Sequence, residues 1–278
     1  MIKPKVLVIG ATGMLGHVVY KYLKQQDKFE MFNSVYRTKL TEDSILCDLR
    51  EEQQLISLFD KVKPDIVINC VGALVQESKK RPSNAIYLNA LLPHKLKDFC
   101  DQHQAKLIHI STDCVFSGKV GNYAENDFRD ADDVYGRSKA LGEIAVEPHC
   151  TLRTSIIGPE LKENGTGLFH WFMQQTSEIK GYTKVYWSGV TTLELAKAIF
   201  KVIDHELKGL YHVTNGQPIS KFDLLNLFNH YRKNKVNIIP HVDHKVNKTL
   251  EKSGKFDFEV SDYSTMVDEM LNNSKLKN

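Results

Sequence analysis

A short apolar run that meets a glycine-rich turn constrains the fold of this chain more than any other feature. Residues 5–9 read Lys-Val-Leu-Val-Ile, which is typical of a buried parallel strand, and apolar residues recur at helical spacing from residue 15 to 23. Strand, glycine turn and helix form the arrangement that binds a dinucleotide, because glycines let backbone amides approach a pyrophosphate at the helix amino end. The spacing is Gly-x-x-Gly-x-x-Gly, and a simple strand-to-helix turn is the alternative. We expect the turn to bind the cofactor through Gly10, Thr12, Gly13, Met14, Leu15 and Gly16.

The same strand-and-helix unit repeats along the first half of the chain. Further apolar runs lie around 31–36, 44–49, 64–72 and 105–110, with helical patterns at 51–62, 84–101 and 135–146. Five such units in series predict an α/β fold of the Rossmann type, a doubly wound parallel sheet. We therefore expect residues 1–150 to form an NAD(P)-binding domain.

Strands and helices alternate less regularly beyond residue 150. A sixth strand at 151–157 is followed by an amphipathic helix at 168–175, whose aromatic residues we expect in a core, and by a capped helix from Thr191 to about His205. A late strand at 209–214 precedes the last clear helix, 222–231. We expect 151–278 to form mainly a small α/β substrate-binding domain, with part of 176–205 returning to the first domain.

Three segments after the glycine turn contain residues expected to contact the cofactor. Arg37 follows the second strand at about the distance where an acid would bind the ribose of NAD and a basic residue would accommodate the 2′-phosphate of NADP. This favours NADP(H), with NADH and a solvated surface arginine as alternatives. Asp48 is expected either to bind the adenine amino group, with Leu49 against the ring, or to cap the next helix. Small residues ending the next strand should pass beneath the cofactor, namely Cys70, Val71 and Gly72.

Tyr135 lies four positions before Lys139, so a helix places both side chains on one face. A phenol has a pKa of about 10, and a neighbouring ammonium lowers it by stabilising the phenolate. Such a tyrosine exchanges a proton with a substrate oxygen near neutral pH.

Composition excludes several classes of protein. The net charge of +3 comes from interspersed charges, which argues against nucleic acid as a partner. We find no signal peptide and no apolar run long enough to span a bilayer, and we expect a cytoplasmic protein without a membrane partner. His241 and His244 lack accompanying carboxylates, so we expect no metal site. Five separated cysteines predict free thiols, namely Cys47, Cys70, Cys100, Cys114 and Cys150.

Several motifs together resemble the extended short-chain dehydrogenases/reductases, and most of all the dTDP-4-dehydrorhamnose reductase family. They are residues 10–16 (Gly-Ala-Thr-Gly-Met-Leu-Gly), 111–118 (Ser-Thr-Asp-Cys-Val-Phe-Ser-Gly), 135–139 (Tyr-Gly-Arg-Ser-Lys) and 152–155 (Leu-Arg-Thr-Ser). The resemblance implies a Rossmann domain that holds NAD(P)H and a carboxyl-terminal domain that holds a nucleotide-sugar.

The resemblance also implies roles for single residues. Thr112 would orient the substrate carbonyl, Tyr135 would donate the proton, and Lys139 would bind the nicotinamide ribose. Asn89 would support the active-site lysine, although a mid-helix asparagine usually faces solvent. The implied reaction is reduction of the C4 keto group of a nucleotide-linked 4-keto-6-deoxy sugar for polysaccharide biosynthesis. The expected substrate contacts are Asp113, Cys114 and Trp187.

Departures from the family pattern bear on the substrate. The family usually has tyrosine where this chain has Cys114, and the segment 180–192 is shorter than usual. We therefore expect a sugar other than dTDP-4-dehydrorhamnose, for example a UDP-linked N-acetylamino sugar. The alternatives are an epimerase or dehydratase of the same fold, although Asp113 lacks a following glutamate, and a non-catalytic NADP-binding regulatory subunit. The sequence also leaves open whether two copies of the chain form a homodimer.

Overall fold

A parallel seven-stranded sheet forms the centre of the computed structural model, which describes residues 2–163 and 165–272. Its strand order is β11-β6-β5-β4-β1-β2-β3, and every neighbouring pair is parallel. The predicted doubly wound α/β sheet is therefore confirmed. Its strands are β1 (Lys5–Ile9), β2 (Glu30–Val35), β3 (Ile45–Leu46), β4 (Ile66–Asn69), β5 (Lys106–Thr112), β6 (Cys150–Thr154) and β11 (Gly209–His212).

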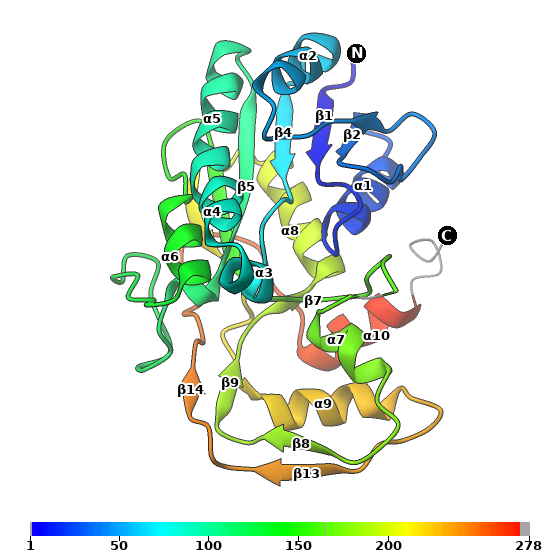
Figure 1. The fold of residues 1–278 in the computed structure, drawn as a ribbon, viewed down its shortest axis with the longest axis vertical. Coiled ribbons are helices and arrows are strands. Elements are labelled where there is room, and N and C mark those ends of the chain that lie inside the picture. Colours follow the sequence, from blue (N-terminus) through cyan, green and yellow to red (C-terminus); the bar gives the residue numbers. More distant parts are fainter. Residues whose placement is uncertain (1, 164, 273–278) are drawn as a thin grey trace.

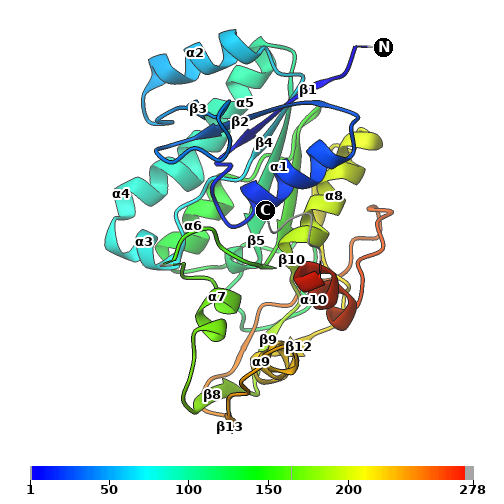
Figure 2. The same ribbon diagram turned by 90° about the vertical axis from the view of Figure 1, so that its right-hand side faces the viewer.

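Helices cover both faces of this sheet (Figure 2). In β1, Val6 and Val8 belong to the core shared with α1 (Gly16–Gln25) and α8 (Thr192–Asp204). The alternate residues of β1 belong to the opposite core, with α2 (Glu52–Val62) and α5 (Leu92–Gln102). Successive side chains of a strand point to opposite faces, so a continuous apolar run is what burial on both faces requires.

A smaller unit lies at the end of the sheet toward which its strands point (Figure 1). Its aromatic core contains Phe169, Phe172 and Phe228, as expected for the helix at 168–175, whereas Trp171 is exposed. Its helices are α7 (Leu168–Met173), α9 (Lys221–His230) and α10 (Tyr263–Asn272). Its short strands are β7 (Ile156–Ile157), β8 (Ile179–Tyr182), β9 (Val185–Trp187), β10 (Val190–Thr191), β12 (Ile219–Ser220), β13 (Ile238–His241) and β14 (Val246–Asn247).

Chain segments from beyond residue 150 also belong to the large sheet. β6 and β11 extend one edge of it, and α8, which overlaps the returning segment expected at 176–205, packs on α1. We therefore restrict the proposed substrate-binding unit to the remaining elements after β6.

Three helix predictions differ from the structure. The helix expected at 135–146 is α6 (Val134–Leu141), which ends before Gly142, where a Cβ would lie 1.9 Å from the Asn89 carbonyl oxygen. The segment expected at 84–101 consists of α4 (Pro82–Ala85), a π-helix η1 (Ile86–Leu91) and α5. The helix at 222–231 is not the last one, since α10 follows it with three buried apolar residues. The short helix α3 (Val75–Lys80) was not expected either.

Candidate functional site

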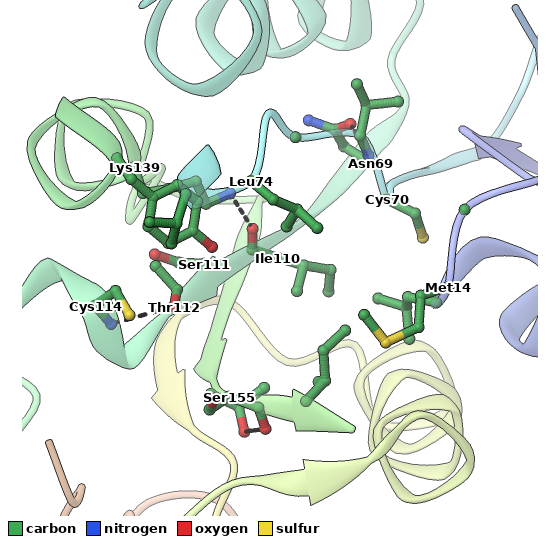
Figure 3. A pocket seen from close by; sticks show the side chains of 18 of the residues that line it. Met14, Asn69, Cys70, Leu74, Ile110, Ser111, Thr112, Cys114, Lys139 and Ser155 are labelled. Carbon is green, nitrogen blue, oxygen red and sulfur yellow. Dashed lines mark hydrogen bonds between the residues drawn. The ribbon is translucent and has the colours of Figure 1, made fainter. Parts of the chain in front are cut away.

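A cavity of about 380 Å³ lies at the carboxyl ends of β1, β4 and β5 (Figure 3). In doubly wound sheets, ligands bind at this edge. The predicted site residues that line it are Thr12, Gly13, Met14, Leu15, Cys70, Val71, Gly72, Thr112, Cys114, Tyr135 and Lys139. Ile156, where the family commonly has an aromatic residue, lines it too. Sequence reasoning missed Asn69, Leu74, Val75, Ile110, Ser111, Thr154, Ser155, Glu160, Leu161 and Lys162, which line it as well.

The glycine turn brings backbone close to one end of the cavity. Gly10 has a positive φ of 80°, and a Cβ there would lie 2.6 Å from Cγ2 of Val71. A Cβ on Gly16 would lie 2.2 Å from the Gly10 carbonyl oxygen, so only glycine lets α1 start this close to β1. Leu15 gives α1 no side-chain cap, and the amides of residues 17–19 bond instead to the backbone carbonyls of Gly13 and Leu15.

The opposite end of the cavity brings Thr112, Tyr135 and Lys139 together. Thr112 ends β5, and its hydroxyl donates to Oδ1 of Asp113 (3.0 Å) and accepts from the Cys114 amide (3.1 Å). Asp133 caps α6 by accepting from the Gly136 amide, which fixes the start of the helix that carries the other two side chains.

Burial, rather than Lys139, controls the ionisation of Tyr135. Burial raises the pKa of the phenol, Cys114 and Asp113 raise it further, and a hydrogen bond with Thr112 only partly offsets them. The Lys139 ammonium instead donates to the Ile110 carbonyl (2.6 Å), and burial lowers its pKa to about 8. The expectation that the lysine makes the phenol acidic is therefore wrong in this structure. A phenol that keeps its proton at neutral pH is suited to donating it.

Asn89 is fully buried, so the expectation of a solvent-facing side chain is wrong. Its amide donates to the Ala73 carbonyl (3.0 Å) and to the Ser138 hydroxyl (3.1 Å), and its Oδ1 accepts from the Ala73 amide (2.8 Å). These bonds tie the loop after β4 to α6 at the residue before Lys139. Asn89 does not line the cavity, so the lysine-supporting role implied by the resemblance would act through Ser138 and α6.

The residues expected near the adenosine lie outside the cavity, beyond the end of β2. The Arg37 guanidinium stacks over the Tyr36 ring at 4.6 Å and donates to its hydroxyl. Asp48 does not cap α2, whose cap position is Glu51; it pairs instead with Arg50 at 2.6 Å, and this bond lowers the pKa of its carboxyl. Leu49, also outside the cavity, packs against the core that includes α2. The sequence prediction missed Arg50, which also donates to the Tyr36 hydroxyl.

Two of the expected substrate contacts do not reach the cavity wall. Trp187 is 3% exposed and belongs to the core of the smaller unit. Asp113 is 5% exposed beneath the Thr112 hydroxyl, and burial raises its pKa. Cys114 does line the cavity, and burial raises the pKa of its thiol to about 12.

The described part of the chain contains no helix long and apolar enough to cross a bilayer. Within those same residues, no three His, Cys, Asp or Glu side chains gather as they would around a metal ion. The five cysteines are all free thiols, as expected.

The family model described as "RmlD substrate binding domain" matches residues 4–273. The chain belongs to this family. The resemblance to dTDP-4-dehydrorhamnose reductases, inferred above from sequence motifs, is thereby confirmed over nearly the whole length of the chain.

Three proteins that are similar to this chain have names that describe different roles. The spore coat polysaccharide biosynthesis protein SpsK of Bacillus subtilis is 29% identical over 79% of this chain and 76% of its own length. Methionine adenosyltransferase 2 subunit beta of Danio rerio is 26% identical over 79% of this chain and 71% of its own. A crystal structure of dTDP-4-dehydrorhamnose reductase from Bacillus anthracis in complex with NADP has a TM-score of 0.84 at 21% identity, covering 98% of this chain and all of that one. At this identity the structural likeness shows the fold alone.

Proposed function

We propose that this RmlD-family chain reduces the C4 keto group of a nucleotide-linked 4-keto-6-deoxy sugar with NADPH. The observation that carries the proposal is that Thr112, Tyr135 and Lys139 line one cavity with the glycine turn. The family membership and the name of the SpsK relative support a role in making an activated sugar for a polysaccharide.

The residues present fit a dinucleotide. The close approach of Gly10 and Gly16 to backbone lets α1 begin directly at the end of β1, and this placement of its amino end suits a pyrophosphate. Arg37 and Arg50 both donate to the Tyr36 hydroxyl beyond the end of β2, and this pair of guanidinium groups supports recognition of a 2′-phosphate. The cofactor of the Bacillus anthracis relative, NADP, is consistent with this choice.

Each of the three cavity side chains then has its own role in the reduction. When bound, the nicotinamide supplies the hydride. Tyr135 donates its phenolic proton to the oxygen that gains charge. The Thr112 hydroxyl, which donates to Asp113 in this structure, would rotate to donate to the same oxygen, so both would stabilise the transition state more than the ground state. The Lys139 ammonium donates to the Ile110 carbonyl and lies 3.5 Å from Nε2 of His109, which leaves at least one donor for a ribose hydroxyl.

The experiment that tests the proposal offers the chain a panel of dTDP-, UDP- and GDP-linked 4-keto-6-deoxy sugars with NADPH and follows the nicotinamide absorbance. We expect stoichiometric NADPH oxidation with at least one member, and UDP-linked N-acetylamino sugars are the first to try because Cys114 lines the cavity with a small side chain. Turnover that conserves the cofactor would instead identify an epimerase or dehydratase.

A second candidate function follows from the similarity to methionine adenosyltransferase 2 subunit beta. A regulatory subunit would bind NADP(H) without turning over any sugar. NADPH binding without oxidation across the whole panel, together with a stoichiometric complex with a partner enzyme, would favour this candidate.

Replacing Arg37 by aspartate should weaken NADPH binding about tenfold or more while leaving NADH binding within about threefold, because a charged hydrogen bond to the 2′-phosphate contributes ~1.5–3 kcal/mol. Dissociation constants from fluorescence titration of each cofactor measure the difference. Lys233→Asp makes the same change of charge at an exposed position of the smaller unit and serves as the control. Equal losses for both cofactors would contradict the assignment of Arg37 to the 2′-phosphate.

The rate of reduction should fall as the pH rises through about 8, where Lys139 loses its proton. In Lys139→Arg the guanidinium does not titrate in this range, so the alkaline limb should disappear even if the rate is lower. The pH dependence of kcat measures both, and a flat wild-type profile between about pH 7 and 10 would refute the role of the ammonium.

The lowered pKa of Lys139 also makes the free energy of unfolding rise with pH between about 8 and 10.5, because there the unfolded chain retains a proton that the folded chain has released.

A further inference from the structure

His109 is fully buried in β5, directly before Ile110, whose carbonyl accepts a hydrogen bond from Lys139 (Figure 3). Nε2 of its ring lies 3.5 Å from the Lys139 ammonium, and Nδ1 lies 3.1 Å from the amide nitrogen of Asn69. The register of β4 and β5 places Asn69 opposite His109. Oδ1 of Asn69 in turn accepts from the Val71 amide (3.1 Å). One series of polar contacts therefore connects Lys139 with Val71.

The number of donors in this series depends on the charge of Lys139. A neutral histidine ring has one donor and one acceptor. Oδ1 of Asn69 is used by Val71, so the amide NH2 group donates to Nδ1 of His109 and the ring proton must lie on Nε2. A charged lysine has donors only, whereas a neutral amine has a lone pair that accepts from Nε2. Every donor in the series therefore has an acceptor only while Lys139 is neutral.

A charged Lys139 requires the opposite arrangement at the ring. Nε2 then accepts from the ammonium, and Nδ1 carries the proton and donates to Oδ1 of Asn69 after the amide group has turned. The turn removes Oδ1 from the Val71 amide, which lies beside the glycine turn, since a Cβ on Gly10 would lie 3.4 Å from the Val71 nitrogen. The charge of Lys139 is thus coupled to the hydrogen bonding of Val71, a residue of the cavity wall.

The surrounding charges leave Lys139 as the group of this series that titrates. Burial lowers the pKa of Lys139 to about 8, against the opposing effect of Glu143 one turn further along α6. Burial also lowers the pKa of His109, and the charges of Lys139 and His94 lower it further, so the ring stays neutral. Burial raises the pKa of the Tyr135 phenol, which therefore stays uncharged over the same range.

We propose that His109 positions Lys139 and that its ring proton moves from Nε2 to Nδ1 when the lysine becomes charged. The ring carries one proton in both states, so the net change is the one proton that Lys139 takes up from solvent. The consequence for catalysis rests on the proposed function, in which the charged lysine binds the nicotinamide ribose. Nε2 would hold the ammonium for that contact, and the Val71 amide would become available to the cofactor.

Nuclear magnetic resonance tests this inference in the full chain, without cofactor or sugar, over the range from about pH 7 to 10 in which a lysine of lowered pKa titrates. Two-bond ¹H–¹⁵N spectra identify the protonated ring nitrogen, and the ¹³Cε shift reports the charge of Lys139. We expect the His109 proton to move from Nδ1 to Nε2 with the same midpoint as Lys139. His149 is the internal control, because its Nδ1 accepts from the Leu107 amide and its Nε2 faces Asp101 at 2.9 Å, so its Nε2 should keep its proton.

His109→Gln provides a second test, because its amide oxygen accepts from the ammonium without a change of tautomer. The Lys139 midpoint should rise by about one pH unit, a tenfold change in the dissociation constant of its proton. His149→Gln replaces another buried histidine, outside the cavity, and should leave the Lys139 midpoint unchanged.

Three outcomes would overturn the inference: a His109 proton that stays on one nitrogen while Lys139 titrates, a Lys139 that does not titrate in this range, and an unchanged Lys139 midpoint in folded His109→Gln. A tautomer change that follows Lys139 in a chain that reduces no keto sugar would refute the proposed function and leave this inference standing. Reduction of a keto sugar by a chain with a fixed His109 tautomer would do the reverse.

Discussion

Tyr135→Phe is expected to lower kcat for keto-sugar reduction by about 10²- to 10⁴-fold, the usual contribution of a positioned acid. The phenol is protonated at neutral pH, because its ordinary pKa of about 10 lies well above 7 and burial raises it further, so Tyr135 has a proton to donate. Removing one oxygen leaves the ring and its packing in place. NADPH affinity should therefore change by less than about threefold, which corresponds to less than ~0.7 kcal/mol.

Steady-state kinetics and cofactor titration on the same preparation separate these effects. Thr112→Val is the companion variant, because it removes the other hydroxyl expected on the substrate oxygen while keeping a β-branched side chain. A Tyr135→Phe enzyme that turned over at the wild-type rate would show that the proton comes from another source. Equal losses of rate and of NADPH affinity would point to a structural role.

The second large effect is expected at Glu143, whose side chain is 1% exposed. Its carboxylate accepts hydrogen bonds from the Ser111 hydroxyl (2.6 Å), from Nε and Nη2 of Arg153 (both 2.8 Å) and from Nη1 of Arg129 (3.0 Å). The Arg153 guanidinium is equally buried and also contacts His212. Glu143 therefore compensates a charge in the core and holds Ser111, a residue of the cavity wall.

Glu143→Ala should lower the free energy of unfolding by about 3–5 kcal/mol, because it leaves the Arg153 charge buried without a partner. Urea unfolding followed by circular dichroism measures the change. The double variant Glu143→Met with Arg153→Met should recover most of the loss, since apolar replacement of a buried pair is often neutral. Glu147→Ala, which breaks an exposed ion pair with Lys208, should cost less than about 1 kcal/mol. A loss at Glu143 no larger than that at Glu147 would refute the role assigned to the buried pair.

The local pattern of apolar residues and glycines was sufficient to predict the central sheet and the cavity wall formed by the glycine turn. Val6 to Ile9 are apolar at every position, and only a strand buried on both faces requires this. The glycine turn could be predicted as well, because the positive φ of Gly10 and the close approach of Gly16 to the Gly10 carbonyl each require a residue without a side chain. Sequence reasoning missed α10, whose three buried residues at 266, 267 and 270 make a weak periodic signal.

The sequence by itself determined the sheet, the glycine turn and the placement of Tyr135 and Lys139 on one helix, because each depends on neighbours within a few residues. Only the tertiary structure decided that Asn89 is buried and that Lys139 bonds the Ile110 carbonyl. It also reversed the expected direction of the Tyr135 pKa. Ionisation depends on burial and on charges brought together from distant segments, and neither is encoded in the spacing of residues along the chain.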